Sequence, residues 1–208
     1  MKIVILCDDY WHPGHVIDKG FGLIGERLGA DIRVIYDARE FDVKALGDTD
    51  VLVFAKSDNT TQSDKTGWMN DSVIGAFETY VANGGGFIAV HSGTVYNGVP
   101  RMKQFLGGAF LSHPEQCPVR FDAIAEHPVT KGVESFAVVD EHYQMDPLEG
   151  VSILGVSSST HNAQAALWVK ELGKGKIIVI TPGHNLEVFE QPGMQTLLIN
   201  AVNYAAKK

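Results

Sequence analysis

Short apolar runs recur through the first half of the chain, separated by segments of mixed polarity. The runs at residues 2–7, 31–36, 51–55 and 86–90 are each the length of one strand. Continuous apolar runs of this length predict strands that are buried on both faces of a parallel sheet. The segment after the first loop predicts a helix that runs to Leu28 and stops at Gly29.

A second helix is predicted between the third and fourth strands. Residues 57–70 form a long polar loop, and Asp71 can cap a helix that continues to about Ala82. Asn83 and Gly84 then end the helix before the fourth strand begins. Strands alternating with helices predict a parallel sheet with helices packed against it.

The second half has more strands and fewer helices. Four short strands are predicted, at residues 120–124, 135–140, 152–157 and 166–171. The last of them forms a β-hairpin with residues 176–180. A closing helix is predicted from about Pro192 to Ala206. We therefore expect one α/β domain over residues 1–208, with a mostly parallel sheet, helices on both faces and an antiparallel flank.

Composition narrows the classes of function. The chain has 208 residues, of which 45% are apolar, and a formal net charge of −8. An acidic chain with no basic cluster disfavours nucleic-acid binding, and no apolar segment is long enough to span a membrane. Only two cysteines are present, Cys7 and Cys117, which favours a reducing compartment and predicts a cytoplasmic protein.

The fourth predicted strand ends in a tight turn that begins with a histidine. His91 is the first polar residue after the apolar run, and Gly93 allows the chain to fold back sharply. A strand-to-helix elbow of this kind lifts one side chain above the end of the sheet, often a nucleophilic Ser or Cys. An imidazole in that place can bind a metal or transfer protons, but it is a poor acyl-transfer nucleophile.

Other polar residues also follow predicted strands. His12 and His15 come after the first strand, and His184 comes after the last one. Asp140 and Glu141 follow a strand of the second half. Ligands of open parallel sheets bind beyond the carboxyl ends of the strands, so these segments are expected to converge on one pocket.

Ordinary structural roles compete with each of these assignments. His15 can simply lie on the first helical turn, Asp140 can cap a turn, and Glu141 can pair with a nearby Lys or Arg. Tyr10, Trp11 and Tyr143 form either a sugar-stacking wall or plain packing. Three further histidines lie among turn residues and are expected at the surface: His113, His127 and His161.

Two glycine-rich segments and both cysteines are not expected to carry chemistry. Residues 173–176 lack the full phosphate-loop pattern and join two strands, whereas residues 84–86 precede a strand rather than follow one. Cys7 is expected inside a core strand as a small apolar group. Cys117 stands beside Pro118 with no obvious base to activate it.

The chain resembles the ThuA-like (trehalose utilisation) family, whose fold is that of the class I glutamine amidotransferases, a flavodoxin-like α/β fold. The resemblance spans nearly the full length and rests on segments that occur in this order: residues 85–93, 127–133, 140–143, 167–169, 173–177 and 182–184, followed by the closing helix. The segments HPVTKG and DE-x-Y, followed by GKGK and PGH, are the most specific of these.

The resemblance implies sugar metabolism without glutamine hydrolysis. His91 stands at the elbow where amidotransferases have the catalytic Cys, and His184 looks like their catalytic His. Glu187 follows His184 by three residues, whereas an amidotransferase has its Glu two residues on. The family is associated with breakdown of trehalose and related disaccharides, often beside dehydrogenases that make 3-keto sugars. His12, after an acidic pair, also matches a position where relatives carry His.

These observations predict a sugar pocket. We expect His91, His184 and Glu141 to be catalytic and His12, Trp11 and Tyr143 to contact substrate. The chemistry is proton transfer on a carbohydrate or keto-sugar, as in an isomerase, hydrolase or lyase. His12, His91 and His184 are candidate ligands of a divalent metal, zinc or manganese.

The alternative is a non-catalytic sugar-binding or regulatory subunit. In either case the expected partner is a small-molecule sugar, with no nucleic acid and no membrane, and a homo-oligomer is compatible with the sequence.

Overall fold

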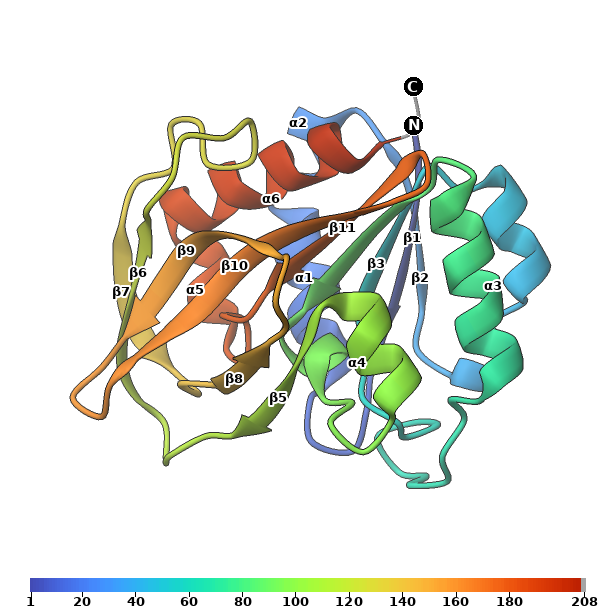
Figure 1. Ribbon diagram of the computed structural model, residues 1–208, viewed down its shortest axis with the longest axis horizontal. Helices are drawn as coiled ribbons and strands as arrows, with labels where there is room; N and C mark the ends of the chain where they lie inside the picture. Colours follow the sequence, from blue (N-terminus) through green and yellow to red (C-terminus); the bar gives the residue numbers. More distant parts are fainter. Residues whose placement is uncertain (207–208) are drawn as a thin grey trace.

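A single twisted sheet forms the centre of the protein. The computed structural model describes residues 1–206. Nine strands lie in the order β2-β1-β3-β4-β11-β10-β9-β6-β7, and β5 and β8 form a separate two-stranded sheet (Figure 1). The strand bounds are β1 Lys2–Cys7, β2 Asp31–Ile35, β3 Val51–Ala55, β4 Gly86–Val90, β5 Gly108–Ser112, β6 Cys117–Ala123, β7 Phe136–Asp140, β8 Gln144–Pro147, β9 Ser152–Ser158, β10 Ala163–Leu172 and β11 Gly175–Ile180.

The sheet has a parallel half and an antiparallel half. All pairings from β2 to β11 along the strand order are parallel, and all pairings from β11 to β7 are antiparallel. This arrangement confirms the predicted α/β fold with a mostly parallel sheet and an antiparallel flank. It also confirms the predicted hairpin, in which β10 and β11 are joined by the turn around Gly173.

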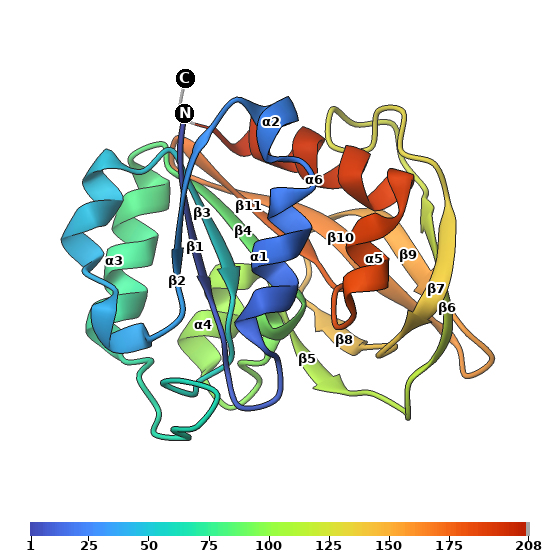
Figure 2. The ribbon, with the colours of Figure 1, turned by 180° about the vertical axis from the view of Figure 1, so that it is seen from behind.

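Helices cover both faces of the sheet. The bounds are α1 Gly14–Gly22, α2 Gly25–Leu28, α3 Asp71–Ala82, α4 Pro100–Leu106, α5 Leu186–Glu190 and α6 Pro192–Ala205, with short 3-10 helices η1 Ala38–Glu40, η2 Val43–Asp48 and η3 His91–Thr94. Helices α3 and α4 lie on one face (Figure 1), whereas α1, α5 and α6 lie on the other (Figure 2).

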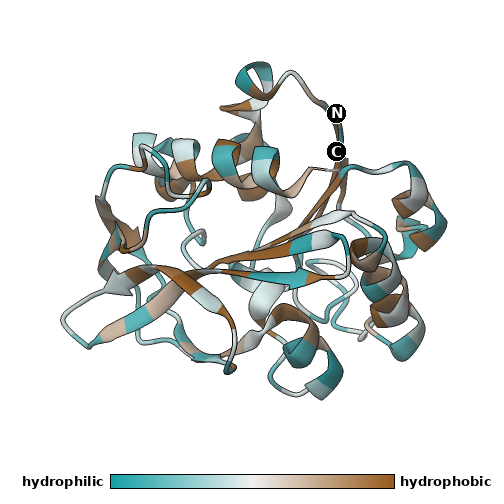
Figure 3. Ribbon diagram, turned by 45° about the horizontal axis from the view of Figure 1, so that its top comes forward, coloured by the Kyte–Doolittle hydropathy of each residue, from teal (hydrophilic) through white to brown (hydrophobic). Residues whose placement is uncertain are grey.

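Alternate strand residues supply the two hydrophobic cores. In β1, Ile3 and Ile5 pack toward α1 and α6, whereas Val4 and Leu6 pack toward α3. This alternation is the two-residue period of a strand that is buried on both faces. Apolar residues accordingly fill the central strands (Figure 3). Among the described residues, no helix is long and apolar enough to cross a membrane.

Two details of the predicted helices are wrong. The helix predicted to run to Leu28 is broken between α1 and α2, in a stretch where Gly20, Gly22 and Gly25 weaken helix formation by about 1 kcal/mol each. The cap of α3 is Asn70 rather than Asp71, since the Asn70 side chain accepts hydrogen bonds from two backbone N–H groups of the first turn.

Several short elements were not predicted from the sequence: α4, α5, β5 and β8. Helix α4 has seven residues, begins with Pro100 at its first position and ends at Gly107, which has a left-handed φ of 77°. The two helices contain too few turns, and the two strands too few apolar residues, to show a clear hydrophobic period.

The strand register brings four chain segments to one edge of the sheet. Cys7 pairs with Ala55, Phe54 with Ala89, and Ile180 with Val90. The residues that follow β1, β3, β4 and β11 therefore emerge side by side. This edge is where the predicted pocket is expected.

Candidate functional site

His91 stands at the elbow after β4, as predicted. It begins η3 with a φ of 46°, an unusual left-handed backbone for a non-glycine residue. A Cβ at position 93 would lie 2.0 Å from the backbone oxygen of Phe54, so only glycine fits there. The elbow thus has a strained residue and a close backbone approach, both of which are typical of functional turns.

The His91 ring is buried and its tautomer is fixed. The side chain is 2% exposed, and Nδ1 donates a hydrogen bond to the backbone oxygen of Thr181 at 2.8 Å. Because a carbonyl oxygen only accepts, Nδ1 carries a proton, and in the neutral ring Nε2 has a lone pair. Nε2 lies 3.3 Å from Oε2 of Glu141. Burial lowers the pKa of His91, which favours the neutral ring.

His12 is held by a fully buried aspartate. Oδ1 of Asp9 accepts from the backbone N–H groups of Trp11 and His12 and from Nδ1 of the His12 ring at 2.8 Å. Its other oxygen accepts from the backbone N–H of Ser57 at 2.9 Å. A carboxylate that fixes one ring nitrogen of a histidine is the usual outer partner of a metal-binding imidazole.

A buried lysine stabilises the same loop by binding its backbone oxygens. Lys56 follows β3, is fully buried, and places its ammonium against the backbone oxygens of Cys7, Asp8 and Tyr36. Asp8 has a left-handed φ of 73°, so this loop contains the second strained residue of the site. Lys56 was missed by the sequence analysis, although it is the first polar residue after an apolar strand.

His184 is positioned by the antiparallel flank. Asp140, at the end of β7, is 1% exposed and accepts hydrogen bonds from the backbone N–H groups of Gly183 and His184 at 2.9 and 3.0 Å. The turn-capping role considered for Asp140 is therefore present, and the turn it caps carries a candidate site residue. Burial raises the pKa of Asp140 above that of an ordinary carboxyl.

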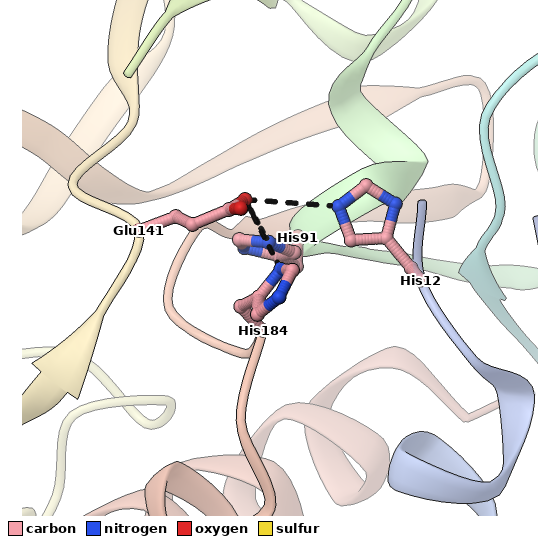
Figure 4. A group of neighbouring side chains, drawn as sticks. All are labelled: His12, His91, Glu141 and His184. Atoms are coloured by element: carbon pink, nitrogen blue, oxygen red, sulfur yellow. Dashed lines mark hydrogen bonds and ion pairs between the residues drawn. The ribbon is translucent and has the colours of Figure 1, made fainter. Parts of the chain in front are cut away.

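Glu141 lies where the three imidazoles meet (Figure 4). Its Oε2 is 3.1 Å from Nδ1 of His184, 3.3 Å from Nε2 of His91 and 3.8 Å from Nε2 of His12. The ring centroids of the histidines are 5.0–5.5 Å apart in edge-to-face arrangements. The convergence expected from four distant segments is thus present in the structure.

The charges of the cluster depend on these contacts. Burial alone would raise the pKa of Glu141, but the imidazoles of His12, His184 and His91 outweigh it and hold that pKa far below its usual range. Burial would likewise lower the pKa of His12, but hydrogen bonds to Asp9 and Glu141 raise it to about 9. In the metal-free protein, His12 and its two carboxylate neighbours form a charged group.

The donor set fits a divalent metal ion. One ligand atom from each of His12, His91, Glu141 and His184 lies within 4.8 Å of the others, and the described residues contain no other such group. Ligands about 2.0–2.1 Å from a tetrahedral zinc ion stand roughly 3.3 Å apart, close to the distances observed around Glu141. Nδ1 of His184 is buried and, although it lies 3.1 Å from Oε2 of Glu141, it makes no hydrogen bond, as expected for a nitrogen that binds metal.

The cavity beside the three rings is too small for a sugar. A cavity of about 10 Å³ is lined by His12, His91 and His184 together with Cys7 and Asp8. That volume holds a single water-sized group. A sugar would therefore have to approach from the solvent side of the cluster, where Glu141 is partly exposed.

The two aromatic residues predicted to bind substrate have different surroundings. Trp11 is 65% exposed next to His12 and stands edge-to-face with Tyr10. Tyr143 is 2% exposed, stacks on the His91 ring at 4.0 Å and places its hydroxyl 3.2 Å from Nε2 of His12. Trp11 thus presents an open face, whereas the Tyr143 ring packs inside the cluster and does not stand in a solvent-facing wall.

His113 lies at the surface, as predicted, but it also borders the candidate site. It was predicted at the surface, and its side chain is 36% exposed, but Nε2 lies 3.7 Å from Oε1 of Glu141. No sequence signal marked it, because it follows a short strand, β5, that the pattern did not reveal. His113 therefore borders the candidate site.

The remaining histidines have ordinary roles. His15 is exposed on the first turn of α1, and His161 is exposed in a turn. His127 accepts a hydrogen bond from the backbone N–H of Val129 and contacts the Tyr204 ring. His142 is buried and bonds to Ser157 and Ser159.

Neither cysteine is placed to act as a nucleophile. Cys7 is fully buried in β1, and burial raises the pKa of its thiol to about 12. Cys117 is half-buried at the start of β6, on the antiparallel flank. At the elbow itself the side chain is an imidazole.

Comparison with protein families gives one match over most of the chain. The family model described as ThuA, trehalose utilisation, matches residues 9–205. The matched range contains all four residues of the cluster. No curated protein matches the chain.

Solved structures share this fold over nearly the whole chain. A ThuA-like protein from Bacteroides uniformis is 22% identical, with a TM-score of 0.77 over 98% of this chain and 90% of that protein. A cytoplasmic protein from Salmonella typhimurium is 16% identical, with a TM-score of 0.71 and complete coverage of both chains. At this level of identity the likeness shows the fold alone.

The same fold also occurs inside a larger enzyme. A β-galactosidase from Rahnella is 16% identical over 97% of this chain but only 31% of its own length, with a TM-score of 0.69. The fold therefore occurs in proteins of different size, and the side chains of the site must decide its function here.

Proposed function

Because the chain belongs to the ThuA family of trehalose utilisation, we propose that it processes a sugar at the cluster of His12, His91, Glu141 and His184. The observation that carries the proposal is the convergence of three imidazoles and one carboxylate, with a buried ring nitrogen left without a hydrogen-bond partner. The substrate class is a disaccharide such as trehalose, or a keto-sugar derived from one.

His12, His91 and His184 are proposed to hold a divalent metal, zinc or manganese. Asp9 and the backbone oxygen of Thr181 orient two of these rings by binding their Nδ1–H groups. A metal held there would polarise a carbonyl or hydroxyl oxygen of the sugar as a Lewis acid.

Glu141 is proposed as the group that moves a proton. Its carboxylate lies between the imidazoles and the solvent side, so it can take a proton from a sugar carbon beside a ketone and return it to a neighbouring atom. Return to the adjacent carbon or oxygen gives an isomerase, departure of the substituent on the neighbouring carbon gives a lyase, and addition of water to the resulting double bond completes a net hydrolysis. Without metal, His91 and His184 would serve as the acid/base pair.

Substrate binding is proposed on the open side of the cluster. Trp11 offers an exposed aromatic face for a sugar ring, and Tyr143 fixes His12 and His91 through its hydroxyl and ring. Glutamine hydrolysis is not part of the proposal, since Cys7 is buried with a raised pKa and His91 takes the elbow. We propose a single domain in the cytoplasm, where a Salmonella protein of the same fold is described.

Metal content and turnover test this proposal together. Untagged protein is loaded with zinc or manganese, dialysed and analysed by plasma mass spectrometry, and turnover is assayed on trehalose and its 3-keto derivative. We expect close to one metal per chain, lost in His91→Ala and kept in the control His15→Ala, which alters an exposed histidine on α1.

Glu141→Gln separates catalysis from binding. The variant should keep the fold and lower turnover by about 10²–10⁴-fold, the usual contribution of a positioned acid or base. Unchanged turnover would remove Glu141 from the chemistry. Sugar binding without turnover in wild type would favour the sugar-binding or regulatory subunit, and absence of metal after reconstitution would leave only the metal-free chemistry.

A further inference from the structure

Glu141 presents its two carboxylate oxygens to different surroundings. Oε2 faces the imidazoles of His12, His91 and His184, whereas Oε1 faces His113 on the loop between β5 and β6. Side-chain exposure rises from 2–18% in the three inner histidines to 36% in His113. The carboxylate thus divides a buried inner side of the site from an open outer side.

The hydrogen bonding of His113 determines which of its nitrogens faces the site. Nδ1 lies 2.8 Å from the backbone oxygen of Pro114, which can only accept, so Nδ1 carries a proton. The ring is parallel to Tyr143, with centroids 5.8 Å apart, and contacts Phe110 at 5.9 Å. These contacts hold the ring so that Nε2 points toward Oε1 of Glu141.

The two facing atoms do not satisfy each other. At 3.7 Å, Nε2 of His113 and Oε1 of Glu141 are beyond hydrogen-bond distance. Within the described part of the chain, Oε1 makes no hydrogen bond. The carboxylate oxygen can only accept, so Oε1 requires a donor from outside the protein, and Nε2 of His113 requires a partner that can donate or accept.

Sugar hydroxyls meet this requirement. One hydroxyl oxygen at about 2.8 Å from each atom can donate to Oε1 and accept from a protonated Nε2, and two adjacent hydroxyls of one ring can instead donate one hydrogen bond to each atom. Because the inner cavity of about 10 Å³ is too small for a sugar, hydroxyl groups must be recognised on this outer side. The open location of His113 allows a ligand to reach the pair without rearrangement of the core.

We propose that His113 Nε2 and Glu141 Oε1 form a hydroxyl-recognition site that selects a polyhydroxylated sugar and orients it toward the inner cluster. His113 is thereby a substrate-contacting residue that does not bind the metal. The inference rests on the proposed function, since it specifies how the same site holds its sugar. It assigns chemistry to a histidine that the sequence pattern placed at the surface.

Three substitutions at His113 isolate the role of Nε2. His113→Phe keeps an aromatic ring against Tyr143 and Phe110 but removes both nitrogens, His113→Ala removes the ring, and His113→Gln restores a polar group at a similar reach. His161→Ala is the matched control, because His161 is an exposed histidine in another turn. Zinc-loaded proteins are titrated with trehalose by isothermal calorimetry and by saturation-transfer NMR, and zinc content is measured for each.

The expected result is a loss of trehalose affinity without a loss of zinc. His113→Phe and His113→Ala should bind trehalose at least about fivefold more weakly than wild type, the effect of one lost hydrogen bond. His113→Gln should recover part of the affinity, and His161→Ala should match wild type. Deoxyglucoses titrated into wild type should show one hydroxyl position whose removal has the same effect as His113→Phe.

Each contrary outcome has a distinct meaning. Equal trehalose affinity in wild type and His113→Phe overturns the hydroxyl-recognition site but leaves the proposed function standing. Loss of zinc in His113→Phe overturns it by making His113 a metal ligand. Failure of the zinc-loaded wild type to bind trehalose, its 3-keto derivative or any of the deoxyglucoses overturns the proposed function and this inference together.

Discussion

The parallel half of the sheet and its antiparallel flank contribute to the site in different ways. In the parallel half, His91 comes directly after β4, His12 lies in the loop after β1, and His184 stands four residues beyond the last residue of β11. The flank contributes Glu141 after β7, and the separate two-stranded sheet contributes His113 after β5, both partly exposed. The three inner imidazoles thus come from the parallel half, whereas the carboxylate and the outer imidazole come from outside it.

The comparison of the two halves shows which side chains of the site are held in fixed positions. The two elbows of the parallel half contain the left-handed residues Asp8 and His91, and each ring is held by a buried acceptor. Asp140 is the link between the halves, because this flank residue clamps the backbone of the turn that carries His184. Rings held this way can keep a fixed geometry while the outer side remains accessible.

Gly93→Ala is expected to have the largest effect, since it disrupts the elbow of the parallel half. A Cβ at position 93 would lie 2.0 Å from the backbone oxygen of Phe54, so β3 or the elbow must shift. We expect a destabilisation of about 3 kcal/mol and loss of zinc binding, measured by urea unfolding and mass spectrometry. Gly98→Ala, where nothing lies within 4 Å, is the control. A fully stable, zinc-binding Gly93→Ala would refute the role assigned to the elbow.

The same contrast explains which site residues the sequence could predict. A residue that follows an apolar parallel strand must emerge at the carboxyl edge of the sheet, so His12, His91 and His184 were identified from position alone. Glu141 was identified because it also follows a predicted strand, although that strand lies in the second half and has a less continuous apolar run. The ThuA resemblance added the family and the order of the segments.

His113 could not be predicted, for a physical reason. It follows β5, a five-residue strand that pairs only with β8, and both strands lie outside the main sheet. The sequence of β5, GAFLS, contains neither an alternation nor an apolar run of four residues or more, so no strand end could be assigned. Lys56 could not be predicted for another reason. A lysine is expected in solvent, and the sequence does not reveal the backbone oxygens that surround its ammonium group.

Substitutions of the two buried aspartates, Asp9 and Asp140, are expected to have intermediate effects and to separate ring orientation from backbone stabilisation. Asp9 contacts the ring nitrogen of His12, whereas Asp140 contacts only backbone N–H groups around His184. We expect Asp9→Asn to weaken zinc affinity by about 10–100-fold, the usual effect of losing an outer-shell carboxylate. Asp140→Asn should lower the free energy of unfolding by about 1–3 kcal/mol with a smaller effect on zinc.

A competition titration with a chelating dye measures both zinc affinities, and urea unfolding measures both stabilities. Equal loss of zinc affinity in Asp9→Asn and Asp140→Asn would contradict this prediction. Orientation of the ring by Asp9 and hydrogen bonding to the backbone by Asp140 would then matter equally for zinc binding. Asp122→Asn, which alters a partly exposed carboxylate paired with Arg120 on β6, is the control. It should leave zinc affinity unchanged.

The smallest expected effect is the pH dependence of the chelator-treated protein, where no metal competes for His12. Hydrogen bonds to Asp9 and Glu141 raise the pKa of His12 from 6.5 to about 9. A raised folded-state pKa means that the stabilisation is complete below pH 6.5 and is lost as pH rises through 9. We expect a loss on the order of 1 kcal/mol across this window, since the ring keeps some contact with solvent. The difference in unfolding free energy between wild type and His12→Gln, measured as a function of pH, isolates the contribution of His12 from other titrating groups. NMR of the His12 ring gives its pKa directly. A His12 pKa at or below 6.5 would show that the parallel half holds this ring neutral, as it holds His91.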